Sequence, residues 1–247
     1  MGKNSDDASR ELTVMRAYIL AANGLLGEHF FEYPQLYATE GLLPSMLRTS
    51  PLVPDSVYAL LGATPMCDEK PETFLSRMAH SDSATTAARD YYLTSLLLEK
   101  RIFKFKEEIN DLYGFESVDS FPKHYREALL LYADIADSTE TVTFKIDDEA
   151  MYARLDALRS EESKHSDVFV RGNYVRRHFG DTYWWYFLYY NWTVIQAKNA
   201  FLNEKNSQLM KSFEKSVDIL PTNLFNSKMW ITFAVLSVES NDSIVFS

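Results

Sequence analysis

The sequence contains few of the residues that build disulfide-rich or turn-rich proteins. Its 247 residues include one cysteine, Cys67, which excludes both an internal disulfide and a multi-cysteine metal site. Only 8 glycines and 8 prolines occur, which favours helices over a β fold with many turns. No stretch reaches the roughly 18 consecutive apolar residues that a membrane-spanning helix requires. The sequence therefore predicts a chain without membrane spans of its own.

Positive charge is also scarce. The formal net charge is −10, from 25 basic and 35 acidic residues, and no run of five basic residues occurs. Nucleic-acid-binding proteins concentrate positive charge to contact phosphates, so we expect no DNA or RNA partner. Apolar residues make up 46% of the chain and aromatic residues 14%. This composition provides a core and argues against general disorder.

The stretch 121–136, FPKHYREALLLYADIA, has the clearest helical pattern, and Pro122 suits the first helical position because it lacks an N–H. One stripe of apolar residues steps by four and three: Phe121, Tyr125, Ala128, Tyr132 and Ile135. A second stripe through Leu129 widens this face. A face of this width needs neighbours on two sides, which is typical of an inner helix in a stacked helical array.

Two other segments show helical spacing. A first helix carries apolar residues at three- and four-residue steps, and Gly24 and Gly27 end it: Leu12, Met15, Ile19, Ala22 and Leu26. Such a stripe is typical of the face that packs against the core. Residues 83–113 predict either one bent helix or two antiparallel helices, with the weak point at 99–101.

From these patterns we predict an all-α fold with about ten helices. Helix pairs joined by short breaks are similar to tetratricopeptide (TPR) repeats, stacked into a right-handed superhelical array. We assign this TPR-like array to residues 1–205. The remaining residues, 206–247, are predicted to be a C-terminal extension that is helical or partly extended.

Four segments resemble an uncharacterised family of membrane proteins from Bacteroidetes, in the same order: residues 24–35 (GLLGEHFFEYPQ) with 41–43, 54–58 with Gly62, 121–132, and 180–187 (GDTYWWYF). In that family a multi-spanning N-terminal half precedes a soluble TPR-like region. The resemblance covers roughly residues 10–190. It implies that this chain is the soluble part of a longer protein whose hydrophobic half lies upstream of Met1. It also implies a location at the cell envelope, tethered to a membrane, and it indicates no catalytic residue.

Metal-binding patterns are incomplete. Glu162 and His165 form a Glu-x-x-His step, which is half of a di-iron carboxylate site, but no second such step occurs. The acidic groups at 147–149 and 107–108 are explained by first-turn carboxylates and charged outer helix faces. We therefore predict no metal site and no cofactor.

Catalytic patterns are also missing. The sequence has no G-x-S-x-G motif, no P-loop and no G-x-G-x-x-G motif, and Cys67 lies in a segment rich in helix-breaking residues, thirteen positions before His80. We expect no catalytic residue, and we expect that the protein is not an enzyme.

The aromatic run 183–192 has two interpretations. Its rings either pack in the core or form a face that binds a partner, because tyrosine and tryptophan dominate interaction hot spots. Stacked helix pairs create concave grooves that bind peptides or helices. We predict a non-enzymatic protein-interaction or scaffold module with a protein or peptide partner, whose groove is lined by Tyr125, Arg126, Tyr183, Trp184 and Tyr186.

An alternative function uses the same rings. If the run 183–192 is an exposed platform, the chain is a glycan-binding or glycan-processing accessory domain of the cell envelope. Carboxylates such as Glu161 or Asp181 would then stand beside the rings. Buried rings would remove the support for this alternative.

Overall fold

The computed structural model describes residues 9–44, 54–116, 118–136 and 144–190, without the side chains of Pro54 and Phe169. The chain divides into two compact units, 1–194 and 195–247, and every described residue belongs to the first. The predicted extension 206–247 lies outside the described residues.

Helices account for the regular structure of this part of the chain, and no strand occurs in it, which confirms the all-α class. The α-helices are α1 (Arg10–Ala22), α2 (Leu26–His29), α3 (Pro54–Leu61), α4 (Pro71–Ala79), α5 (Thr86–Leu98), α6 (Ile102–Tyr113), α7 (Lys123–Ile135), α8 (Glu149–Ser163) and α9 (Val168–Phe179). The short 3₁₀ helices are η1 (Phe30–Glu32), η2 (Ala38–Gly41) and η3 (Val118–Ser120). Residues 183–190 are also helical.

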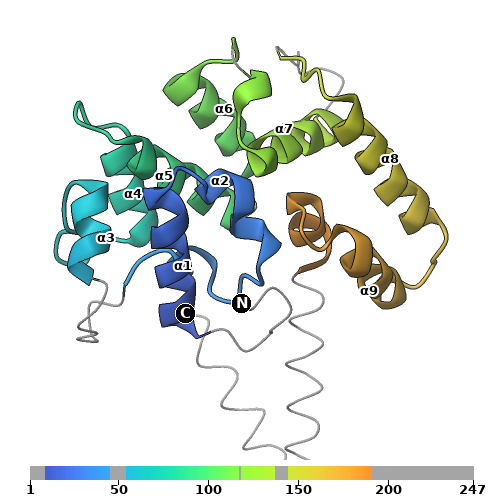
Figure 1. The fold of residues 1–247 in the computed structure, drawn as a ribbon, viewed down its shortest axis with the longest axis horizontal. Helices are drawn as coiled ribbons and strands as arrows, with labels where there is room; N and C mark the ends of the chain where they lie inside the picture. Colours follow the sequence, from blue (N-terminus) through green and yellow to red (C-terminus); the bar gives the residue numbers. More distant parts are fainter. Residues whose placement is uncertain (1–8, 45–53, 117, 137–143, 191–247) are drawn as a thin grey trace, which may run out of the picture. The chain divides into compact units, whose positions relative to one another are not determined.

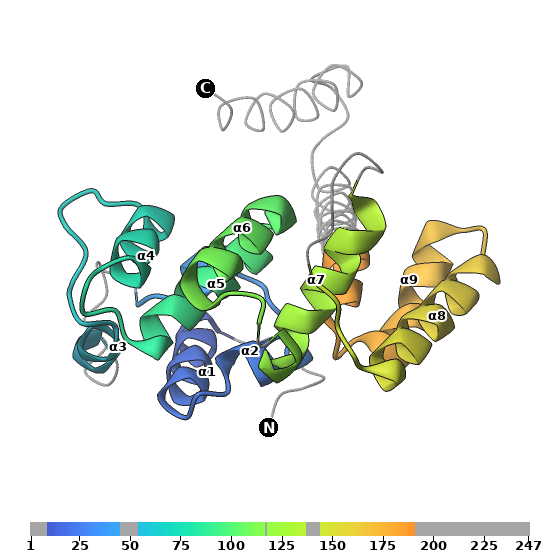
Figure 2. The same cartoon turned by 90° about the horizontal axis from the view of Figure 1, so that it is seen from above.

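Successive helices pack against one another. Helix α4 contacts α5, α5 contacts α6, α6 contacts α7, and α8 contacts α9. Figures 1 and 2 show α4, α5, α6 and α7 in chain order, and α8 beside α9. Neighbour-to-neighbour packing is the pattern of helical repeats, although the TPR-like superhelix itself stays a prediction.

Helix α7 is the inner helix that the 121–136 stretch predicts. Residues 124, 125 and 127–132 are all buried, a face much wider than one flat surface would cover. Helix α2 packs on α7 and α6 contacts it as well, so α7 has neighbours beyond a single layer. Pro122 stands one position before the first helical residue, and Ile135, at the last turn, is exposed.

Residues 83–113 form two helices that pack on each other. Helix α5 ends because Lys100 adopts a left-handed conformation, with φ +56°. The Lys100 N–H donates to the Leu97 carbonyl at 3.0 Å, and the Arg101 N–H donates to the Leu96 carbonyl at 2.9 Å. These bonds are those of a Schellman motif, which usually has glycine at the left-handed position. Of the two alternatives left open for residues 83–113, the structure therefore shows two helices, and the weak point at 99–101 is where they separate.

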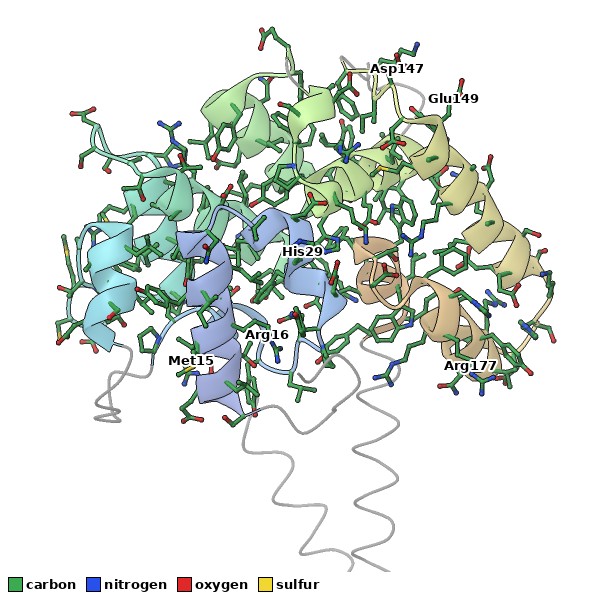
Figure 3. The ribbon with its side chains drawn as sticks, viewed as in Figure 1. Met15, Arg16, His29, Asp147, Glu149 and Arg177 are labelled. Atoms are coloured by element: carbon green, nitrogen blue, oxygen red, sulfur yellow. The ribbon has the colours of Figure 1, made fainter. Side chains whose placement is uncertain are left out.

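Helix α1 corrects one expectation. Its buried residues are Thr13, Val14, Ala17 and Ala21. Of the residues expected to face the core, Leu12, Met15, Ile19 and Ala22 are exposed instead, whereas Leu26 is buried as expected but belongs to α2. Small residues allow α2, α5 and η2, all of which contact α1, to approach its backbone closely. The helix consequently turns its larger apolar residues outward, and Figure 3 shows Met15 on its surface.

The backbone of α2 at Gly27 lies so close to Pro122 and Tyr125, at the start of α7, that it has no room for a side chain. A Cβ atom added at Gly27 would lie 2.7 Å from Cζ of Tyr125 and 2.9 Å from Cβ of Pro122. Because both neighbours are rigid rings, we expect Gly27→Ala to lower the free energy of unfolding by about 1–3 kcal/mol. The matched control is Gly41→Ala, whose added Cβ meets the Thr13 methyl carbon at 3.1 Å. Urea denaturation should show the larger loss for Gly27→Ala, and equal losses would contradict the tight contact.

Candidate functional site

The four rings predicted to line a groove are core residues. Tyr125, Tyr183, Trp184 and Tyr186 are all buried. The expectation that they form an open aromatic groove is therefore corrected: in the described structure they are not accessible to a partner. The glycan alternative loses its support for the same reason, since Trp185, Tyr189 and Tyr190 of the same run are buried too.

Arg126, the fifth predicted groove residue, is partly buried and engaged within the chain. Its Nε donates to the Phe121 carbonyl at 2.9 Å, and its Nη1 donates to Oδ2 of Asp148 at 2.6 Å. Asp148 in turn caps the first residues of α8, accepting from the Met151 N–H at 3.0 Å. Arg126 therefore ties the start of α7 to the start of α8.

The hydroxyls of two buried tyrosines complete the C-terminus of α5. Tyr183 donates to the Leu97 carbonyl at 3.2 Å, and Tyr186 donates to the Leu98 carbonyl at 2.7 Å. The last carbonyls of a helix have no partner within it, and leaving them buried and unpaired is costly. Tyr186 thus supplies a donor to the Leu98 carbonyl, and Tyr183 adds a second donor to the Leu97 carbonyl, which also accepts from the Lys100 N–H.

Lys100, which follows α5, donates a hydrogen bond in the opposite direction, from the end of α5 to the segment 183–190. Its Nζ donates to the Phe187 carbonyl at 2.7 Å and lies 5.5 Å from the centre of the Tyr186 ring. Burial disfavours the charged ammonium and lowers the pKa of Lys100 to about 8. The end of α5 and the helical segment 183–190 therefore hold each other through three hydrogen bonds.

Glu127 is the centre of a buried polar network, called here the Glu127 junction: Glu127, His124, Tyr183 and Trp184. Its Oε2 accepts from the Tyr183 N–H at 2.8 Å and from Nδ1 of His124 at 2.9 Å. Its backbone carbonyl accepts from Nε1 of Trp184 at 2.8 Å. His124 is 0% exposed and Glu127 1% exposed. A carboxylate that orients a histidine is also found in catalytic dyads, but this histidine is inaccessible to a substrate.

Charged groups surround the rim of this junction. Lys123 Nζ lies 3.1 Å from Oδ2 of Asp181 and 3.9 Å from a Glu127 oxygen, and Arg154 donates to Asp181 Oδ1 at 2.6 Å. Burial alone would raise the pKa of Asp181, but the attraction of Lys123 and Arg154 outweighs it and holds that pKa below its ordinary value. Asp181 is therefore an ion-pair partner, engaged on both of its oxygens.

Three of the segments that carry the family resemblance meet here. Segments 121–132 and 180–187 supply the junction itself. Segment 24–35 packs on it, because Glu28 accepts from the Lys123 N–H at 2.6 Å. The Phe31 ring lies 5.4 Å from the His124 ring and 5.1 Å from the Tyr183 ring, centre to centre. The distinctive residues of these segments thus serve to join helices far apart in the sequence.

A second buried polar cluster lies where α5, α6 and α7 meet. The Tyr125 hydroxyl lies 3.3 Å from Oδ1 of Asp90 and 3.2 Å from the Asp90 carbonyl, and the Tyr113 hydroxyl lies 3.3 Å from the same Oδ1. Burial raises the pKa of Asp90 to about 6, although both tyrosine hydrogen bonds lower it. Among the described carboxyl groups with a displaced pKa, Asp90 is the one whose pKa is raised, whereas those of Glu69, Glu161 and Asp181 are lowered.

The residues considered for metal binding have other partners. Glu162 accepts a hydrogen bond from the Tyr189 hydroxyl, and His165 lies 3.4 Å from Glu161 and stacks on the Tyr174 ring. Within the described residues, no three histidine, cysteine, aspartate or glutamate side chains gather in a way that would hold a metal ion. None of the helices in this part of the chain combines the length and apolar character needed to cross a membrane. The membrane attachment implied by the resemblance stays a prediction.

The accessible candidate site is the outer stripe of α1, defined as Leu12, Met15, Ile19 and Ala22. Leu12 is 46% exposed, Met15 36% and Ile19 52%. Their spacing of three, four and three residues follows positions a and d of a heptad, the seam along which two helices pair. The sequence pattern revealed this stripe, but not that it faces outward. The sequence feature that could have indicated the buried side is a second stripe of small residues, which includes Ala17 and Ala21.

Comparison with known proteins places the chain in a family. The model of a family of unknown function, DUF6057, matches residues 66–190, which is half of the chain and contains α4 to α9. Comparisons with curated proteins and with solved structures gave no match. The expectation that the chain belongs to an uncharacterised family is thereby confirmed, whereas a family of membrane proteins from Bacteroidetes with TPR-like repeats stays a prediction. The chain belongs to DUF6057, a family of unknown function.

Proposed function

We propose that this region is a non-enzymatic protein-interaction module that binds an amphipathic helix along the outer stripe of α1. One observation carries the proposal: Leu12, Met15 and Ile19 are 36–52% exposed and share one face of the helix. An exposed apolar row of this spacing is what a groove-binding or pairing helix recognises.

The chemistry of the stripe selects a helix as the bound element. Positions a and d alone form a narrow seam, which one helix lying nearly parallel to α1 covers completely. Covering Leu12, Met15 and Ile19 would contribute about 1 kcal/mol for each side chain, because roughly half of each is still in water. The net charge of −10 argues against a nucleic-acid partner.

Internal pairing of the candidate catalytic groups supports a non-enzymatic role. His124 and Glu127 are sealed in the core, and Asp181 is held between Lys123 and Arg154. Glu161, the other carboxylate considered for glycan chemistry, is paired with Lys164 at 2.7 Å. These groups stabilise the helices that present α1, and we assign them no part in a reaction.

Site-specific photo-crosslinking tests the proposal. We expect p-benzoylphenylalanine at position 19 to give a discrete adduct in cells that express the natural protein. The same group at position 152 should give none, since Tyr152 on α8 is 43% exposed but lies outside the stripe. Mass spectrometry should map the adduct to a helical segment with apolar residues three and four apart.

A second substitution shows whether the adduct depends on the stripe. Met15→Lys should abolish the adduct at position 19 while leaving the far-UV circular dichroism unchanged, because Met15 already reaches solvent. Equal adducts at positions 19 and 152, or an adduct that survives Met15→Lys, would refute binding along α1.

A further inference from the structure

The outer stripe of α1 is suited to one particular helix. Resting on the proposed function, we infer that its partner is α1 of a second copy of this chain, packed antiparallel, so that two copies form a two-fold symmetric dimer. In such a pairing the same surface of each copy meets its equivalent, as closed symmetric dimers require.

Side-chain volume fixes the direction of this pairing. When two α1 helices run antiparallel about a centre level with Ala17, Leu12 lies opposite Ala22 of the other copy and Met15 lies opposite its Ile19. No layer then joins two alanines. Parallel pairing would instead place Ala22 against Ala22 and Leu12 against Leu12. The two alanines would leave a gap at one end, which is unfavourable because protein interiors contain few voids.

Charge also favours self-pairing at this face. Between Leu12 and Leu25 the sequence has no acidic residue and one basic residue, Arg16. Arg16 is occupied within its own chain, with its guanidinium 4.0 Å from the centre of the Tyr33 ring. Two copies that each carry a net charge of −10 repel on average, so a face whose one carboxylate, Glu11, stands at its end is where they approach at low electrostatic cost.

The two ends of α1 are complementary in the antiparallel arrangement. Arg10 and Glu11 stand at the first turn, whereas the last turn and the residues after it, up to Leu25, are uncharged. Antiparallel pairing places the charged end of each helix beside the uncharged end of the other, so no like charges meet. The two helix dipoles also oppose each other, which is the favourable arrangement.

Engineered cysteines test both the dimer and its direction in the full-length chain. Cys67, which is exposed, is first replaced by serine, and Met15→Cys and Ile19→Cys are made separately in that background. When the two variants are mixed under oxidising conditions, we expect the disulfide between positions 15 and 19 to exceed both symmetric disulfides. Tyr152→Cys is the control for random oxidation.

Sedimentation measures the same association without crosslinks. We expect the unmodified chain to sediment increasingly as a dimer with rising concentration, and Leu12→Lys to weaken self-association about tenfold or more. Unchanged circular dichroism would show that Leu12→Lys still folds. A monomer at every concentration, or disulfides no more abundant than those of Tyr152→Cys, would overturn the dimer.

The outcomes separate this inference from the proposed function. Predominance of 15–15 and 19–19 disulfides would overturn the antiparallel arrangement. A photo-crosslink from position 19 to another protein, with a monomeric purified chain, would leave the proposed function standing and refute self-pairing. A crosslink from position 19 into residues 10–22 of this chain itself supports both.

Discussion

Glu127→Ala should lower the free energy of unfolding by about 3–5 kcal/mol, the largest loss that we expect from removing one charged side chain. Glu127 is 1% exposed and accepts hydrogen bonds from the Tyr183 N–H and from Nδ1 of His124. The variant leaves both donors buried without an acceptor and leaves Lys123, 3.9 Å away, with one carboxylate fewer. Unpaired buried donors lose their full interaction with water, which is why the effect is large.

Chemical denaturation of the full-length chain, followed by far-UV circular dichroism, measures this loss. Glu127→Gln retains an oxygen for the Tyr183 N–H and should lose less than Glu127→Ala. Asp156→Ala is the exposed control: its carboxylate is 74% exposed and lies 3.4 Å from Arg159, so its removal should cost at most about 1 kcal/mol. A similar small effect for Glu127→Ala would show that the junction does not hold the helices together.

The second large effect depends on pH and arises at Asp90. Its pKa is raised to about 6 by burial, against 3.8 for an exposed aspartate. Between these two values the folded state binds more protons than the unfolded state, so stability falls as pH rises. The contribution of the protonated carboxyl is fully present below about pH 3.8 and is lost as pH rises through 6. Two pKa units correspond to about 3 kcal/mol.

Asp90→Asn should remove this pH dependence. Asparagine is neutral at every pH and still offers an oxygen to the hydroxyls of Tyr125 and Tyr113. We therefore expect Asp90→Asn to be no more stable than the wild type at pH 4 but about 3 kcal/mol more stable at pH 7.

Urea denaturation of both chains at half-unit pH steps provides the comparison. Asp156→Asn, on the exposed side of α8, should give a difference from the wild type that does not change over the same range. If Asp90→Asn instead became less stable relative to the wild type with rising pH, the carboxylate would be stabilised as an anion. The neighbouring Arg89 would be the first group to examine.

The sequence alone determined the local features of this protein. Helix spacing and stop signals predicted α7 with its wide buried face, the weak point between α5 and α6, and a stop at Gly24 after α1. These features depend on contacts within one or two turns, through backbone geometry and side chains three or four residues apart. Local sequence contains that information in full.

Only the tertiary structure decided which faces are buried. Helix α1 has two stripes, and neighbouring helices selected the small residues Ala17 and Ala21 over the larger Met15 and Ile19, because close backbone approach requires small side chains. The rings of Tyr183 and Tyr186 are core residues, and their hydroxyls donate to carbonyls at the end of α5, which lies more than 80 residues away in the sequence. Periodicity defines the faces of a helix, whereas burial depends on partners distant in sequence, which no local pattern specifies.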